Sequence, residues 1–162
     1  MADMLAALYD LPDSSELYKE LADKGIKIMR AMTPNKYLVE EYLRENHSEG
    51  ITGEVMTAFC HHPVSCFIAF DTEAYKIVGY AAYDCTYRGF FGPTAVHADY
   101  RGKNIGTALL MRTLEAMRDE GYAYAIIGGV GGAKAFYEKK CGATVIENST
   151  PGIYKDWIRK KQ

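Results

Sequence analysis

A short basic turn with two glycines, Arg101-Gly102-Lys103-Asn104-Ile105-Gly106, is the segment of this sequence best suited to bind a ligand. It follows an apolar run at 90–96 and precedes apolar residues spaced by three, four and seven, as on one face of a helix. The first N–H groups of a helix have no partner within it, and the peptide dipoles place positive charge there. The glycines allow close approach, and Arg101 and Lys103 add charge. The turn predicts a phosphate or pyrophosphate site; a helix entry with two surface cations is the simpler alternative.

The composition is that of an ordinary globular protein. Of the 162 residues, 48% are apolar and 25% are charged, and we expect one domain over 1–162, with an N-terminal extension at 1–24 that carries a short helix. The net charge of −2 argues against a general nucleic-acid-binding protein. No apolar run approaches the roughly 18–20 residues that span a bilayer, and the first residues lack a secretion pattern. We therefore expect no membrane partner and a cytoplasmic location.

The four cysteines, Cys60, Cys66, Cys85 and Cys141, include no C-x-x-C pair. A chain of this length does not need disulfide bonds to fold, so we expect free thiols in a reducing compartment. The cluster Cys60-His61-His62-Pro63-Val64-Ser65-Cys66 holds zinc-ligand residue types, but its spacing fits no standard structural zinc pattern. We expect a helix end, a turn at Pro63 and the start of a strand here, and no bound metal.

The rest of the sequence alternates between helix and strand patterns. Residues 1–13 carry no clear pattern, and residues 151–158 favour a strand slightly over a short helix. Since proline cannot donate to a sheet ladder, Gly92-Pro93 predicts a bulge or break in the strand at 90–96. The expected elements are helices at 14–24, 33–46, 52–60, 105–120 and 133–141, and strands at 26–32, 64–71, 76–86, 90–96, 122–128 and 144–146.

The segment V-x-x-D-Y-R-G-K-x-I-G-x-A-L-L, residues 96–110, resembles the coenzyme A pyrophosphate loop of the GNAT-type N-acetyltransferase superfamily. That loop is usually written Arg/Gln-x-x-Gly-x-Gly/Ala. Arg101 and Gly106 match its first and last positions, and Asn104 stands where the first glycine is usual. Asparagine tolerates a positive φ better than most residues, so we expect the same loop to form.

A second stretch resembles the next motif of the same superfamily. The glycine-rich turn at 128–132 is followed by A-x-x-F-Y-E-K-x-x-G, residues 133–142. In that superfamily the tyrosine of this helix lies near the coenzyme A sulfur, which implies that Tyr137 is the general acid for the departing thiolate. Val130 stands where the superfamily often has an asparagine. The two motifs occur in the right order, and the resemblance covers about residues 26–147.

The resemblance implies an α/β fold of the GNAT type. Its centre is a mixed, mostly antiparallel sheet with one splayed parallel pair of strands, flanked by helices. The strands at 90–96 and 122–128 would form that pair, with the bulge beside the pantetheine arm of the cofactor. The implied cofactor-binding residues are Ala95, Val96, Arg101, Gly102, Lys103, Asn104, Ile105, Gly106, Thr107, Gly128, Gly129, Ala133 and Phe136.

The implied activity is the transfer of an acetyl group from acetyl-CoA to a primary amine, by direct attack and without a metal. The attacking amine must be neutral, so a general base is desirable. Asp84, near the end of its strand, is one candidate; His97 and the pair His61-His62 are others, and a water chain to solvent is a further answer.

Other classes of function stay open at this point. A coenzyme-A-binding regulatory or sensor domain would keep the loop without turnover, and an interaction module would bind no cofactor. Tyr80, Tyr83 and Tyr87 fit an acceptor pocket or simple sheet packing equally well. The partners we expect are acetyl-CoA and an amine of unknown identity, with a homodimer as an open possibility.

Overall fold

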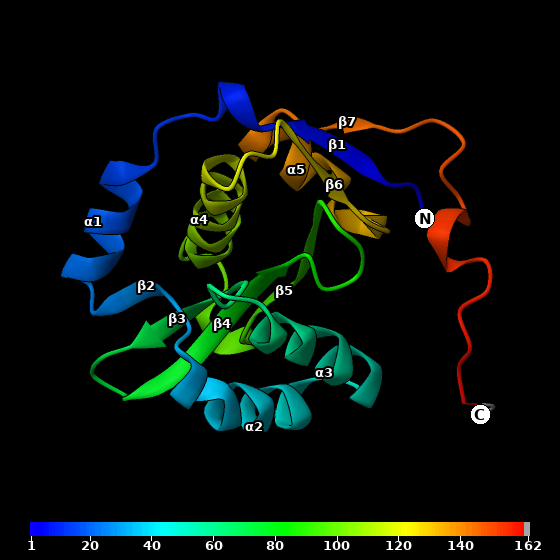
Figure 1. Cartoon of the computed structure of the whole chain (residues 1–162). Helices are drawn as coiled ribbons and strands as arrows, with labels where there is room; N and C mark the ends of the chain where they lie inside the picture. Colours follow the sequence, from blue (N-terminus) through cyan, green and yellow to red (C-terminus); the bar gives the residue numbers. More distant parts are fainter. Residues whose placement is uncertain (161–162) are drawn as a thin grey trace.

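One seven-stranded sheet organises the protein (Figure 1). The computed structural model describes residues 1–160. The strands are β1 (Met4–Ala7), β2 (Ile26–Arg30), β3 (Cys66–Asp71), β4 (Lys76–Tyr83), β5 (Phe90–Val96), β6 (Tyr124–Ile127) and β7 (Thr144–Val145). Their order across the sheet is β2-β3-β4-β5-β6-β1-β7, and neighbours are antiparallel except β5 and β6, which are parallel. This arrangement confirms the predicted mixed sheet with one parallel pair.

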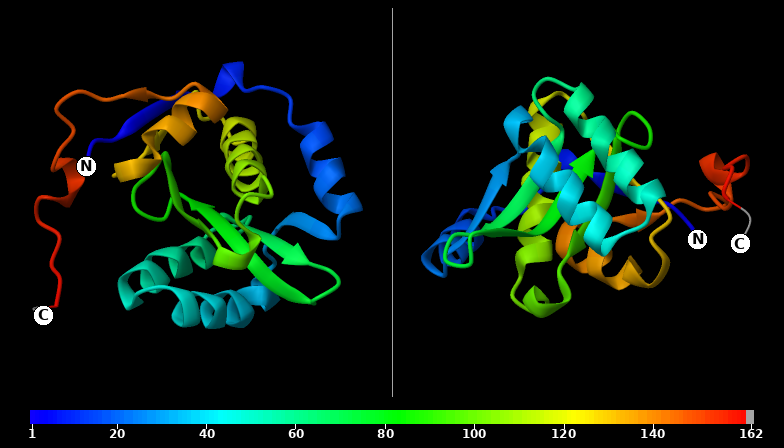
Figure 2. Two further views of the ribbon diagram at one scale, coloured as in Figure 1. Left: turned by 180° about the vertical axis from the view of Figure 1, so that it is seen from behind. Right: turned by 90° about the horizontal axis from the view of Figure 1, so that it is seen from below.

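Helices cover both faces of the sheet (Figures 1 and 2). They are α1 (Ser15–Asp23), α2 (Lys36–Asn46), α3 (Glu49–Met56), α4 (Ile105–Asp119) and α5 (Lys134–Cys141). Residues of α1, α4 and α5 belong to one buried cluster, and residues of α2 and α3 belong to a second. Along β3, Phe67 and Ala69 lie in the first cluster while Cys66 and Ile68 lie in the second, because successive side chains of a strand point to opposite faces.

The long helix α4 joins β5 to β6. Its predicted apolar stripe is confirmed: Leu109, Leu114 and Met117 are fully buried. The helix ends at Asp119, and Gly121 has φ +102, the left-handed conformation predicted for the helix end. Since α4 connects two parallel neighbours, it begins beyond the carboxyl end of β5 and crosses one face of the sheet.

The strand β4 ends earlier than predicted. It stops at Tyr83 because Asp84 has φ +56, which lies outside the strand region. Tyr80 and Tyr83 are each 1% exposed and belong to opposite buried clusters, so sheet packing accounts for both. Tyr87 is exposed.

The expectation of no clear pattern at residues 1–13 is wrong. The strand β1 is an inner strand that pairs with β6 on one edge and β7 on the other. Met4, Ala6 and Leu8 are fully buried, and their alternation is the signal that the sequence carried. The strand is only four residues long and its partners lie far along the chain, so the local pattern was too short to identify it.

The strand favoured at residues 151–158 is also wrong. The chain forms a single 3-10 turn, Gly152–Tyr154, and then runs along the outside of the molecule near the N-terminus (Figures 1 and 2). Gly152 has φ +57, a left-handed conformation that lies outside the strand region. Tyr154 packs against Gly128 instead of joining a strand.

Candidate active site

The parallel strands β5 and β6 separate after a short paired stretch. They pair only at Phe90 with Ile126 and at Phe91 with Ile127. Beyond that point β5 carries the predicted bulge, at Gly92-Pro93, and continues alongside β4 alone. One edge of β5 is therefore left without a strand partner over residues 92–96, and an opening lies between the two strands.

Alternation of the backbone decides which groups of β5 face this opening. The N–H of His97 donates to the Val78 carbonyl of β4 at 2.8 Å. Successive N–H groups of a strand point to opposite edges, so Ala95 also faces β4, while Thr94 and Val96 face the opening. Of the two residues predicted to contact a cofactor arm through the backbone, Val96 directs its N–H and carbonyl toward the opening and Ala95 directs them toward β4. The Val96 carbonyl accepts a hydrogen bond from Arg101 Nε at 3.3 Å.

A small pocket of about 290 Å³ lies where β5 meets the start of α4. Asn104 has φ +64, which confirms the expected left-handed conformation, and Gly102 has φ +76. Lys140 joins Arg101 as a second cation of the pocket, and the sequence reasoning missed it. The predicted residues that line this pocket are Val96, Arg101, Gly102, Asn104, Ile105, Gly106, Thr107 and Phe136.

Three other predicted cofactor residues lie outside that lining. Lys103 directs its Nζ toward the ring of Tyr100, 5.0 Å from the centroid. Ala133 packs against the buried cluster around α4, and Ala95 packs against the cluster on the opposite face. The pocket is thus built from the turn itself, the end of β5 and one face of α5.

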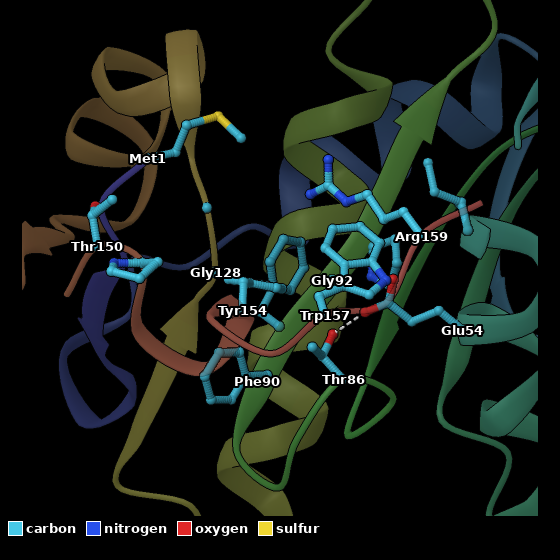
Figure 3. A pocket seen from close by; sticks show the side chains of 15 residues that line it. Met1, Glu54, Thr86, Phe90, Gly92, Gly128, Thr150, Tyr154, Trp157 and Arg159 are labelled. Carbon is cyan, nitrogen blue, oxygen red and sulfur yellow. Dashed lines mark hydrogen bonds between the residues drawn. The ribbon is translucent and has the colours of Figure 1, made fainter. Parts of the chain in front are cut away.

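A larger cavity of about 440 Å³ lies at the other end of the opening (Figure 3). It holds the remaining predicted residues, Gly128 and Gly129, which follow β6. Phe90, Phe91 and the Gly92-Pro93 bulge form its wall on β5. The two cavities share no lining residue. The small pocket, with two cations, lies at one end of the opening, and the larger, mostly apolar cavity lies at the other.

Tyr137 lines neither cavity, but its ring packs against one lining residue of each. Its ring centroid lies 6.2 Å from that of Phe91, which lines the large cavity, and 5.2 Å from that of Phe136, which lines the small one. The side chain is buried, and burial raises the pKa of Tyr137 to about 12, with a smaller effect from Cys141. The hydroxyl is therefore protonated at neutral pH and is able to donate.

The carboxylate of Asp84 is engaged in the turn between β4 and β5. It accepts the Gly89 N–H at 2.7 Å and the Tyr122 hydroxyl at 2.8 Å. Asp84 and His61 line a separate surface pocket and not the large cavity. In the loop after β5, His97 Nδ1 lies 3.7 Å from Asp99 Oδ2. The hydrogen bonds with Gly89 and Tyr122 give Asp84 a structural role, and its role as a base stays a prediction.

Sequence reasoning missed Glu54 of α3. Its side chain is half-buried, lines the large cavity and accepts a hydrogen bond from the Thr86 hydroxyl (Figure 3). Burial raises the pKa of Tyr154, and the nearby charge of Glu54 adds to the effect. Nothing in the local sequence marks Glu54, because a glutamate in a short helix is ordinarily solvated. Only the packing of α3 against the start of β5 brings it to the cavity.

Asp3 ties the two ends of the chain to the glycine-rich turn. Its side chain is 6% exposed, and its Oδ1 accepts the N–H of Gly129 at 2.8 Å. The Asp3 N–H donates to Ser149 Oγ at 2.8 Å, and its carbonyl accepts the Ile146 N–H at 2.9 Å. This buried residue thereby fixes Gly129 and the start of the C-terminal segment relative to β1.

Replacing Asp3 with alanine should destabilise the protein. The change leaves the part-buried Gly129 N–H without its acceptor, which costs about 1 kcal/mol, the lower end of the range for a fully buried donor. Thermal unfolding should show a lower midpoint for Asp3→Ala, while Asp10→Ala, at an exposed position near the same strand, should leave it unchanged. Equal midpoints for the two variants would contradict the role given to Asp3.

Three features are absent from residues 1–160. No group of three or more histidine, cysteine or acidic side chains is placed to hold a metal ion within these residues, and their four cysteines form no disulfide. No helix in the same range is both long enough and apolar enough to cross a membrane.

Comparison with solved structures places the fold among N-acetyltransferases. The GCN5-related glucosamine N-acetyltransferase region of a fungal multi-domain GH3 beta-N-acetylglucosaminidase matches 90% of this chain with a TM-score of 0.67 and 11% identity. A GCN5-related N-acetyltransferase from Sphaerobacter thermophilus matches 90% with a TM-score of 0.64 and 19% identity. This chain spans only 19% and 48% of the lengths of those two proteins.

A third solved structure has a length close to that of this chain. The glucosamine-6-phosphate N-acetyltransferase from Arabidopsis thaliana matches 85% of this chain and 97% of its own, with a TM-score of 0.55 and 16% identity. At such identities these likenesses establish the fold alone. A search of the curated proteins found no match. The model of the acetyltransferase (GNAT) family matches residues 17–143, so this chain belongs to that family.

Proposed function

We propose that this protein transfers an acetyl group from acetyl-CoA to a primary amine. The observation that carries the proposal is the opening between β5 and β6, which has a basic turn at one end and the glycine-rich turn at the other. Membership of the acetyltransferase family supports it.

The residues of the opening suit a ligand with an anionic end and a long arm that carries amides. The N–H groups at the start of α4, with Arg101 and Lys140, attract a pyrophosphate. The unpaired edge of β5, with Val96 facing outward, offers backbone groups to the amides of the arm. From Gly92 to Val96 this edge runs four residue steps, about 13 Å. The reacting group of the ligand would thus lie near the bulge.

In this reaction the protein has to bind the two substrates and assist proton transfer. The neutral amine nitrogen attacks the thioester carbonyl carbon, a C–N bond forms, and the C–S bond breaks. The nitrogen gives up one proton toward solvent, and the departing thiolate takes one proton from the Tyr137 hydroxyl, which regains it from water. The products are the N-acetylated amine and free coenzyme A, with no covalent intermediate on the protein.

Location and assembly form part of the same proposal. A cytoplasmic location suits the four cysteines, which form no disulfide among residues 1–160. A homodimer stays a prediction, and sedimentation of the purified protein is the measurement that tests it.

Release of thiol from acetyl-CoA tests this function. The protein should bind acetyl-CoA and release free thiol when a suitable primary amine is added, at a rate that depends on both concentrations. Binding of acetyl-CoA without thiol release, over a broad panel of amines, would favour the sensor domain. Absence of binding would favour an interaction module and contradict the proposal.

A further inference from the structure

The large cavity has the features of an acceptor site, and its chemistry restricts the acceptor. We infer that it binds a primary amine carried on a short apolar, ring-bearing body, with the nitrogen against Glu54 as an ammonium group and the ring between the aromatic walls. The ammonium group gives one proton to solvent before the neutral nitrogen attacks the thioester. This inference rests on the proposed acetyl transfer.

The position of the cavity fits an acceptor. Its wall includes Phe91, Gly92 and Gly128, which mark the point where β5 and β6 separate. An acetyl group on an arm laid along β5 from the basic turn would arrive at this point. The acceptor must reach it from the other side, and the cavity opens there without using any residue of the small pocket.

Glu54 supplies a recognition point for an ammonium group. Its carboxylate accepts one hydrogen bond, from Thr86, and a carboxylate has room for several more. No lysine or arginine within residues 1–160 lies within ion-pair distance of Glu54. A half-buried carboxylate without a cationic partner is well suited to a ligand cation, because such charge-assisted hydrogen bonds are strong.

The walls supply the rest of the selectivity. Phe90, Tyr154 and Trp157 line the cavity (Figure 3), and the ring centroids of Tyr154 and Trp157 lie 5.8 Å apart. The one other charged residue of the lining, Arg159, is stacked on Trp157 with its guanidinium 3.9 Å from the ring centroid. Aromatic faces contact an apolar ring well and attract a cation beside them. A volume of about 440 Å³ suits a small single-ring molecule rather than a long chain.

Much of this wall comes from outside the family-matched region. The match ends at residue 143, whereas Tyr154, Trp157 and Arg159 lie in the C-terminal segment. Asp3 donates its N–H to Ser149 Oγ and accepts the N–H of Gly129, and these two hydrogen bonds hold the start of that segment beside the opening. Selection of the acceptor therefore depends on a part of the chain that the family model does not include.

Four amines distinguish this acceptor from others. With the whole protein and saturating acetyl-CoA, kcat/KM for 2-phenylethylamine should exceed those for phenylalanine, spermidine and glucosamine 6-phosphate by at least roughly tenfold. One unfavourable charge or one desolvated polar group in the site is enough to produce a difference of that size. Phenylalanine adds a carboxylate near Glu54, spermidine lacks a ring, and glucosamine 6-phosphate adds a phosphate and a polar body.

Two variants with matched controls test the named contacts. Glu54→Gln should raise KM for 2-phenylethylamine by roughly ten- to a hundredfold, and Trp157→Ala by roughly tenfold, with unchanged affinity for acetyl-CoA. Glu49→Gln, at an exposed position of the same helix, and Ile158→Ala, beside Trp157 but 92% exposed, should leave KM unchanged.

The outcomes separate this inference from the proposed function. An equal or higher kcat/KM for another of the four amines, or an unchanged KM in both Glu54→Gln and Trp157→Ala, would overturn the acceptor assignment and leave acetyl transfer standing. Absence of thiol release with every amine would overturn the proposed function and the acceptor assignment together.

Discussion

Replacing Tyr137 with phenylalanine should lower kcat by roughly ten- to a thousandfold, which spans the loss of one hydrogen bond to the loss of a general acid. The change removes only the hydroxyl and keeps the ring contacts with Phe91 and Phe136. Affinity for acetyl-CoA should change little, because the basic turn that would hold the pyrophosphate is untouched. Steady-state kinetics and calorimetry on the same preparation measure both quantities.

The pH profile adds a second readout for Tyr137. Burial raises the pKa of this hydroxyl to about 12, so the proton donor is present throughout the range from pH 7 to 10. The activity of the unmodified protein should not fall in that range through ionisation of Tyr137. Tyr75→Phe, at an exposed tyrosine outside both cavities, is the control and should keep full activity. A fully active Tyr137→Phe variant would show that solvent protonates the leaving group.

Replacing Gly106 with glutamate should weaken binding of acetyl-CoA by roughly a hundredfold or more. Gly106 lines the small pocket in the first turn of α4, where an anion is attracted, and the glutamate adds a negative charge at that place. The fold should be retained, because a Cβ at this position would meet only Val96 Cγ2, at an ordinary 3.6 Å. Calorimetric titration with acetyl-CoA and thermal unfolding separate the two effects.

Two substitutions control for the bulk and the charge of that change. Gly106→Ala adds one carbon at the same place and should keep the fold and most of the affinity. Gly53→Glu adds the same charged side chain on α3, where nothing lies within 4 Å of the new Cβ, and should not affect acetyl-CoA binding. Unchanged affinity for acetyl-CoA in a folded Gly106→Glu variant would show that the basic turn is not part of the cofactor site.

The parts of the fold that could be predicted are those encoded locally. The run at Phe90–Val96 coincides with β5, and the bulge follows from the proline at position 93. The turn before α4 forms as expected because asparagine at position 104 accepts a left-handed conformation. Most residues of the small pocket are contiguous in the sequence, so one pattern located them together.

The parts that could not be predicted depend on contacts between distant segments. The strand β1 is defined by its pairing with β6 and β7, and its four residues alone do not require a strand. Glu54 and Trp157 meet at one cavity although they are 103 residues apart in the sequence. Lys140 joins the small pocket only because α5 packs next to the start of α4. The acceptor side is therefore a property of the assembled fold.

Isotope transfer tests the central claim most directly. The protein is incubated with acetyl-CoA labelled in the acetyl group and with the panel of amines, and the products are analysed by mass spectrometry. The label should appear in an N-acetylated amine, with one free thiol for each amine acetylated, and Tyr137→Phe should slow both to the same degree. Label found only in free acetate, or left in acetyl-CoA with every amine, would contradict acetyl transfer at this site.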